Sequence, residues 1–313
     1  MPTAPRIRSR RETRIAQTPE SVVEVNGMKL CWDSFGNPSH PALILIMGMG
    51  AQMIGWDDEF CLQLAARGFR VIRFDNRDVG KSSWFDLAGV PDVNRAMMRA
   101  WLRWPVDAPY LLDDMALDVV WLMDALGIQR AHVAGASMGG TIAQVMAIRY
   151  PERMLSMTSI MSTTGDPDLP KPSTTAVTAV MRPMPSEIDA YVARYVDTYR
   201  MLRAGRFPEE EARDRARAVR NHARGINPAG GARHLVAILA SGSRKKALRN
   251  VKVPTLVIHG DIDPLVPLAA GVETAQCVPG AELMVLQGMG HTMPAYLWPQ
   301  MIDGITAVAA RSR

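Results

Sequence analysis

The hydrophobic positions of this chain form short apolar runs separated by helical repeats, which is typical of a sheet covered by helices. Two strand-like runs, 21–25 and 28–36, flank Asn26-Gly27, a dipeptide that favours the tight turn of a β-hairpin. Continuous apolar strands are expected where helices cover both faces of a parallel sheet. Such runs follow at 42–48, 70–77, 130–137, 154–162, 253–261 and 281–288. The pattern therefore predicts an α/β fold, with a mostly parallel sheet opened by an antiparallel hairpin.

Helical spacing fills the stretches between the later strands. Apolar side chains recur every three or four residues at Leu111, Met115, Val119, Leu122 and Leu126. Further helices are predicted over 139–149, from about 267 and from near Pro294. The alternation of strands and helices indicates a doubly wound sheet.

Residues 165–247 break this alternation. They hold Pro-rich entry segments and amphipathic, Arg-rich helical stretches, with no convincing strand. We therefore predict a helical cap, inserted after the sixth strand, over 165–247. The α/β core is expected to comprise 20–164 and 248–313, and residues 1–19 are expected to be a disordered basic tail.

Composition and charge exclude several classes of protein. The chain has 313 residues, 48% of them hydrophobic and 21% charged, as in ordinary globular domains. Five arginines and one glutamate give the first fourteen residues a charge of +4 out of a total of +5, so the rest of the chain is nearly neutral. We expect no nucleic-acid partner and no stable membrane insertion, because there is neither a basic groove nor an apolar run of about 18 residues.

The three cysteines, Cys31, Cys61 and Cys277, have neither the spacing of a zinc site nor an even number for disulfide pairing. This pattern favours a reducing compartment, and we expect a cytoplasmic location.

The main chemical motif is Gly135-Ala136-Ser137-Met138-Gly139, a GxSxG sequence between a predicted strand and a predicted helix. Glycine is needed beside the serine because the strand-to-helix turn is too sharp for flanking side chains. Ser137 would then be exposed above the sheet as a nucleophile, next to the positive end of a helix.

A serine nucleophile needs a base, and the base needs an acid that orients it. His291 follows the last predicted strand, and Asp263 follows the strand before it. The order Ser137, Asp263, His291 is that of the α/β-hydrolase triad. Two other acids, Asp261 and Asp166, also lie just beyond strand ends and remain alternatives to Asp263.

Two backbone amides are expected to stabilise a developing oxyanion. Met138 N–H lies at the start of the helix after the serine, and Met49 N–H lies in the glycine-rich loop 47–50 after an earlier strand. Methionines surround the same place, and we expect Gly48, Met289 and Met293 to line the substrate pocket. The segment Asp75 to Asp78 is expected to be a structural network that fixes its loop.

The segments LIMGMGAQ, FDNRDVGKS, GASMGG, HGDIDPLVP and GMGH resemble the α/β-hydrolase superfamily over nearly the whole chain after residue 20. They are similar in detail to the branch that contains aclacinomycin methylesterase and related bacterial lipases and esterases. The resemblance implies a metal-free serine hydrolase with a helical cap and no cofactor, acting on a carboxylic ester.

We therefore expect a carboxylesterase that forms an acyl-enzyme on a medium-sized, largely apolar, small-molecule ester. A thioesterase or a cofactor-free perhydrolase of the haloperoxidase type could use the same triad. A non-catalytic receptor for a small ligand is the alternative from another class. A homodimer also stays open.

Overall fold

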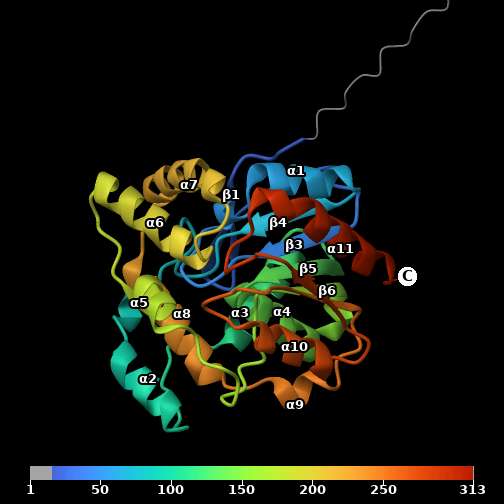
Figure 1. Cartoon of the computed structure of the whole chain (residues 1–313). Helices are drawn as coiled ribbons and strands as arrows, with labels where there is room; N and C mark the ends of the chain where they lie inside the picture. The colour runs from blue at the N-terminus through green and yellow to red at the C-terminus, as the bar shows by residue number, and fades with distance from the viewer. Residues whose placement is uncertain (1–15, 313) are drawn as a thin grey trace, which may run out of the picture.

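The centre of the computed structural model, which describes residues 16–312, is an eight-stranded sheet (Figure 1). Its strands lie in the order β1-β2-β4-β3-β5-β6-β7-β8. β2 is antiparallel to β1 and β4, and all other neighbours are parallel. The strands are β1 Ser21–Val25, β2 Met28–Phe35, β3 Ala42–Ile46, β4 Arg70–Phe74, β5 Ala131–Ala136, β6 Met154–Ile160, β7 Thr255–Gly260 and β8 Glu282–Leu286. The predicted α/β architecture is confirmed.

The opening hairpin turns at the predicted dipeptide. Asn26 has a φ of 48° and Gly27 a φ of 73°, so both central residues are left-handed. Two positive φ angles give a turn whose twist matches that of the flanking strands. The antiparallel pairing of β1 with β2 follows from this local geometry.

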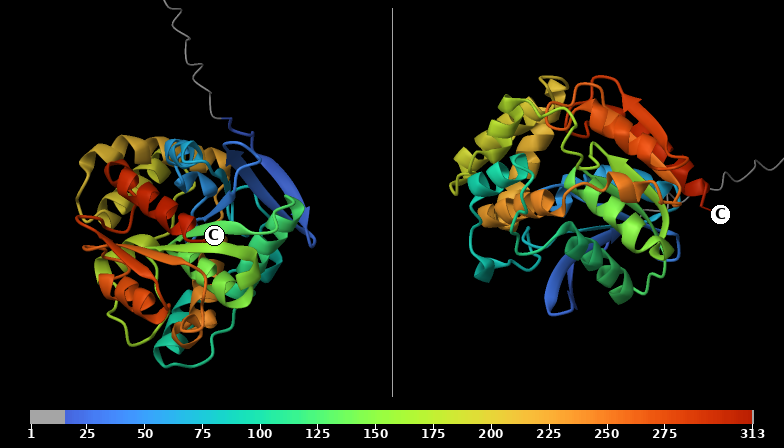
Figure 2. Two further views of the ribbon diagram at one scale, coloured as in Figure 1. Left: turned by 90° about the vertical axis from the view of Figure 1, so that its right-hand side faces the viewer. Right: turned by 90° about the horizontal axis from the view of Figure 1, so that it is seen from below.

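Helices cover both faces of the sheet (Figure 2). Successive residues of β3 alternate between the two cores, with Ile44 in one and Leu43 and Leu45 in the other, as the period of a strand requires. One core packs α3 and α4 against the sheet, and the other packs α1 and α11. These core helices, with α10, are α1 Asp58–Ala66, α3 Leu112–Ala125, α4 Met138–Arg149, α10 Leu268–Cys277 and α11 Trp298–Ala310. The α11 helix begins at Trp298, after a short 3-10 turn at Ala295–Leu297.

A helical segment lies between β6 and β7. Its helices are α5 Thr174–Met181, α6 Ile188–Leu202, α7 Glu211–Arg224, α8 Pro228–Ser241 and the short α9 Lys245–Leu248. α6 packs on α5 and α7, while α8 also contacts α3 of the core. α2 (Val93–Trp101) comes from a region that we assigned to the core, yet it packs on α8 beside the inserted helices (Figure 1).

The N-terminal part of the described chain is ordered from an earlier residue than we predicted. Thr18 N–H donates to the Ser34 carbonyl, and Gly36 N–H donates to the Ala16 carbonyl, each at 2.8 Å. Backbone pairing with the end of β2 thus fixes residues 16–19, which we had placed in the tail. Residues 1–15, with the basic cluster, lie outside the described residues.

No helix within residues 16–312 is both long and apolar enough to cross a bilayer.

The turn between β5 and α4 lies at the carboxyl edge of the sheet and is strained. Ser137 has a φ of 54° and a ψ of −118°, a region that strains any residue with a Cβ. A Cβ on Gly135 would lie 2.0 Å from the Gly139 carbonyl oxygen, and one on Gly139 would lie 2.0 Å from the Ile46 carbonyl oxygen. Both glycines of the motif are therefore required by the close approach of backbone segments.

Replacing Ser137 by glycine should stabilise the protein. The strain is worth about 1–3 kcal/mol, and glycine costs about 0.5–1 kcal/mol of unfolded-state entropy, so the free energy of unfolding should rise by about 1 kcal/mol. Ser137→Ala keeps the Cβ and is the matched control, with an expected change within about 0.5 kcal/mol. Urea denaturation measures both, and equal changes in the two variants would contradict the assignment of strain to this turn.

The stability of the fold should fall at acidic pH because of His132 in β5. This side chain is buried and hydrogen-bonded to Ser156, and burial lowers its pKa to about 4. In the unfolded chain the pKa is about 6.5, so between these values the unfolded state binds more protons and stability decreases as pH falls. Between pH 7 and pH 5 the expected loss is about 1–2 kcal/mol from this residue. In His132→Leu the free energy of unfolding, measured by urea denaturation, should fall by about 1–2 kcal/mol less between pH 7 and pH 5 than in wild type. An unchanged pH dependence would show that His132 is not responsible.

Candidate active site

Ser137 lies at the carboxyl edge of the sheet, where hydrogen bonds to its backbone groups fix its position. Its N–H donates to the Ile160 carbonyl of β6 at 2.9 Å, and its carbonyl accepts from the amides of Gly140 and Thr141 in α4. The Ser162 hydroxyl donates to the same carbonyl at 2.9 Å. These contacts fix the backbone while the side chain stays half-buried and free to face a cavity.

The structure brings His291 and Asp263 to Ser137. His291 Nε2 lies 3.0 Å from Ser137 Oγ, and its Nδ1 lies 2.7 Å from Asp263 Oδ2. Because a carboxylate accepts hydrogen bonds, Nδ1 carries the proton and Nε2 is left to accept from the serine hydroxyl. The three predicted residues form one continuous hydrogen-bonded line.

The carboxylate of Asp263 is fixed on its other side by the backbone. Its Oδ1 accepts from the amides of Leu265 at 2.9 Å and Val266 at 2.8 Å, which turns Oδ2 toward the imidazole. The two alternative acids are engaged elsewhere. Asp261 Oδ1 accepts from Gly288 N–H at 2.6 Å, and Asp166 pairs with Lys245 at 2.6 Å. Neither is hydrogen-bonded to His291.

The backbone loop after β3 lies directly over Ser137. A Cβ on Gly48 would lie 3.3 Å from the serine Cβ, a tight contact, so glycine lets the loop pass this close to Ser137 without displacing either segment. Asn76 Nδ2 donates to the Met47 carbonyl at 3.0 Å, and Ala51 N–H closes a turn onto the Gly48 carbonyl at 3.3 Å. Met138 is the first residue of α4, where a backbone N–H has no acceptor within the helix.

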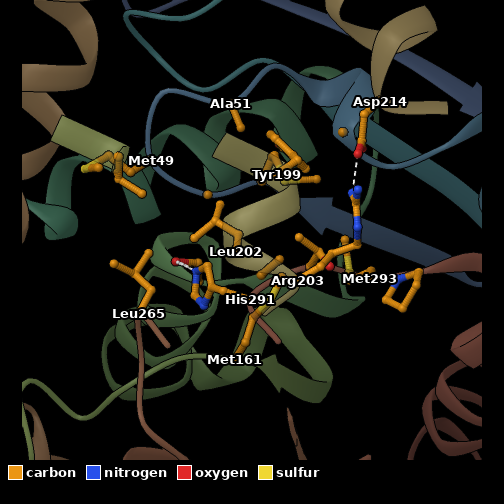
Figure 3. Close-up of a pocket in the computed structure, with 18 of the residues that line it drawn as sticks. Met49, Ala51, Met161, Tyr199, Leu202, Arg203, Asp214, Leu265, His291 and Met293 are labelled. Atoms are coloured by element: carbon orange, nitrogen blue, oxygen red, sulfur yellow. Dashed lines mark hydrogen bonds and ion pairs between the residues drawn. The ribbon is translucent and has the colours of Figure 1, made fainter. Parts of the chain in front are cut away.

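Two neighbouring cavities open beside these residues. The smaller, about 140 Å³, is lined by Ser137 and His291. Figure 3 shows His291 at this cavity. Gly48 and Met293, which we expected at the substrate pocket, line it together with Met49. Met289 does not line either cavity. It is fully buried in the core between the sheet and α11, because the turn after β8 directs its side chain inward, so its predicted role in the pocket is wrong.

The larger cavity has a volume of about 580 Å³ and lies under the inserted helices. Three tyrosines of α6, at positions 191, 195 and 199, line it together with aliphatic and methionine side chains of α5 and α8. Met49, Ala51, Val180, Tyr199 and Leu202 line both cavities, so the two chambers adjoin one another.

Charged side chains close one end of the smaller cavity, and they are paired with one another. Arg203 forms an ion pair with Asp214 (Figure 3). Arg217 pairs with Asp57 at 2.6 Å and with Asp214 at 3.3 Å. Burial raises the pKa of Asp214, against the opposing effect of the Arg203 hydrogen bond. This end of the cavity is therefore polar, although its charges are compensated.

The segment from Asp75 to Asp78 binds the inserted helices to the core. The Asp78 carboxylate accepts two bonds from Arg233 of α8, at 2.6 and 2.8 Å, and one from the Tyr110 hydroxyl at 2.6 Å. Asp75 accepts from the amides of Met53 and Lys81 and pairs with Arg224 at the end of α7. This is the fixed network that we expected, and it also reaches the inserted segment.

Two contacts at the site were not anticipated. The backbone N–H of His291 donates to the Leu202 carbonyl at the end of α6, at 2.7 Å. His234 of α8 is fully buried against the loop over Ser137 and hydrogen-bonds to Gly50 N–H. Nothing in the sequence identifies either contact, because a backbone carbonyl and a single histidine in a helix carry no motif.

Within residues 16–312, no cluster of three or more His, Cys, Asp or Glu side chains is arranged to hold a metal ion.

Known proteins match nearly the whole chain. The family described as the alpha/beta hydrolase fold matches residues 41–294. Rhodomycin D methylesterase DnrP of Streptomyces peucetius is 30% identical over 92% of this chain and 97% of its own length. Rhodomycin D methylesterase DauP of Streptomyces sp. strain C5 is 29% identical with the same coverage.

A solved structure agrees in fold. The enol-lactonase of Burkholderia xenovorans LB400 superposes with a TM-score of 0.65 and 26% identity, covering 93% of this chain and 99% of that one. With the two methylesterases, these matches confirm the prediction of a hydrolase of the esterase type. The chain belongs to the alpha/beta hydrolase fold family.

Proposed function

We propose that this protein is a serine hydrolase that cleaves a carboxylic ester through an acyl-enzyme. The observation that carries the proposal is the line of hydrogen bonds from Asp263 to His291 to Ser137, at 2.7 and 3.0 Å. The nucleophile, the base and the group that orients the base are thus within reach of one another at a cavity wall.

In the first half of the reaction His291 Nε2 removes the proton from Ser137 Oγ as the oxygen attacks the ester carbonyl. Asp263 keeps the proton on Nδ1 and stabilises the imidazolium that forms. His291 then donates its new proton to the leaving alcohol, and the acyl group stays on the serine. In the second half the same imidazole activates water, which releases the acid.

The amides of Met49 and Met138 are the proposed donors to the oxyanion. Met138 N–H has no acceptor within α4, because it is the first residue of the helix, and the helix dipole also favours negative charge there. Met49 lies in the loop that crosses above Ser137. Backbone donors held in this way need no reorganisation when the charge develops.

The sizes of the two cavities support a small alcohol and a large, mostly apolar acyl group. The chamber at Ser137 measures about 140 Å³, whereas the adjoining chamber with three tyrosines measures about 580 Å³. The two full-length Streptomyces relatives are methylesterases, whose leaving alcohol is small. We therefore favour a methyl or similarly short alkyl ester of a bulky, ring-containing acid.

Removing the nucleophile or the acid should abolish turnover. In Ser137→Ala and Asp263→Asn the rate with the best ester should fall on the order of 10⁴-fold or more. Asp261→Asn and Asp166→Asn are matched controls and should stay within about threefold of wild type, because neither carboxylate is hydrogen-bonded to His291. Steady-state kinetics and a fluorophosphonate label on Ser137 measure this. Full activity in Ser137→Ala would rule out the proposal.

Filling the larger cavity should change specificity without harming the chemistry. Ala232 lines only that chamber, so Ala232→Trp should lower kcat/KM roughly tenfold or more for methyl esters of ring-containing acids. The kcat/KM for methyl acetate should stay within about threefold. Ala232→Val adds little volume and serves as the control. An equal loss for both esters would mean that the larger cavity does not hold the acyl group.

A further inference from the structure

The buried His234 of α8 connects the inserted segment to the loop over Ser137. Its Nδ1 lies 3.1 Å from the Gly50 amide nitrogen, and its Nε2 lies 2.8 Å from the Arg77 carbonyl oxygen. The side chain is fully shielded from solvent. Its two ring nitrogens therefore bridge two core loops that are 27 residues apart in sequence (77 against 50).

These partners determine which nitrogen carries the proton. A backbone N–H can only donate, so Nδ1 must be unprotonated, and a carbonyl can only accept, so Nε2 must carry hydrogen. His234 is thus neutral, in the Nε2–H tautomer. Burial lowers its pKa to about 4, which keeps the ring neutral at ordinary pH.

The charged groups around the ring are already satisfied by one another. Asp78 is paired with Arg233 and accepts from Tyr110, while Arg77 pairs with Asp118. Within residues 16–312, no carboxylate is hydrogen-bonded to His234. Arg233 and Ser241 also attach α8 to the core, at Asp78 and at the Leu112 amide, so this attachment does not depend on His234.

The contact with Gly50 fixes the loop that carries Met49. The start of this loop is held by Asn76 at the Met47 carbonyl, and its turn is closed by Ala51 onto Gly48. The bond to His234 fixes the orientation of the peptide between Met49 and Gly50. With both ends and this peptide fixed, the direction of the Met49 N–H is determined as well.

We propose that His234 is a positioning residue for ester hydrolysis: it holds Gly50 N–H so that Met49 N–H points at the oxygen that becomes negatively charged. This inference rests on the proposed function. Because the bond aims a donor at the transition state, its loss lowers kcat much more than it changes KM.

Three substitutions of His234 distinguish the contribution of the Nδ1 contact from that of the Nε2 contact. In His234→Asn the amide oxygen can take the place of Nδ1 and keep Gly50. In His234→Gln the amide nitrogen can take the place of Nε2 and keep only Arg77, and His234→Leu keeps neither contact. We expect kcat to fall on the order of 10²-fold in His234→Gln and His234→Leu, with KM within about threefold of wild type. In His234→Asn the fall in kcat should be less than about fivefold.

Two further measurements separate aiming from packing. Affinity for an alkyl boronate, which binds Ser137 as a tetrahedral adduct, should fall in parallel with kcat in His234→Gln and His234→Leu. Affinity for the carboxylic acid product should not change. In the wild-type protein, ¹⁵N NMR of the imidazole at pH 7 should give the neutral Nε2–H tautomer, a result that needs no variant to fold.

Each other outcome has a definite meaning. The role of His234 would be overturned by a wild-type kcat in folded His234→Gln and His234→Leu, or by equal losses of kcat in His234→Asn and His234→Gln. An Nδ1–H or charged ring at pH 7 would overturn it as well. If wild-type protein instead has no turnover that depends on Ser137, the proposed function fails, and this inference fails with it. If turnover depends on Ser137 but is unchanged by substitution of His234, this inference fails and the proposed function stands.

Discussion

The close approach of the β5–α4 turn to the end of β3 is the constraint on which the site depends. The backbone of Gly139 passes so near the Ile46 carbonyl that a Cβ there would lie 2.0 Å from its oxygen. This contact starts α4 directly beneath the serine and places the loop after β3 directly above it. Ser137, a helix N-terminus and a loop amide are thereby brought together by backbone packing, before any side chain contributes.

The parts of the fold that the sequence predicted are those governed by local chemistry. Asn26-Gly27 determined the hairpin, apolar runs determined the buried strands, and the glycines around Ser137 determined the turn. The order of the serine, the aspartate and the histidine along the chain was informative because carboxyl ends of parallel strands share one edge of the sheet.

The parts that escaped prediction depend on contacts between distant segments. The direction of the Met289 side chain is set by the turn after β8, which spacing alone does not specify. The packing of α2 on α8 is such a contact, since the two helices lie far apart in the sequence. The ordering of residues 16–19 comes from backbone pairing with β2, to which side-chain composition gives no clue.

The hydrogen bond from His291 N–H to the Leu202 carbonyl shows that the inserted segment does more than cover the cavity. Gly290 packs against the same end of α6, since a Cβ there would lie 2.2 Å from the Leu202 oxygen. If the inserted segment swung away as one rigid piece, it would pull on His291, the proposed general base. Engineers who graft the insertion of one relative onto another should therefore carry over the end of α6 together with the histidine loop, as a single unit.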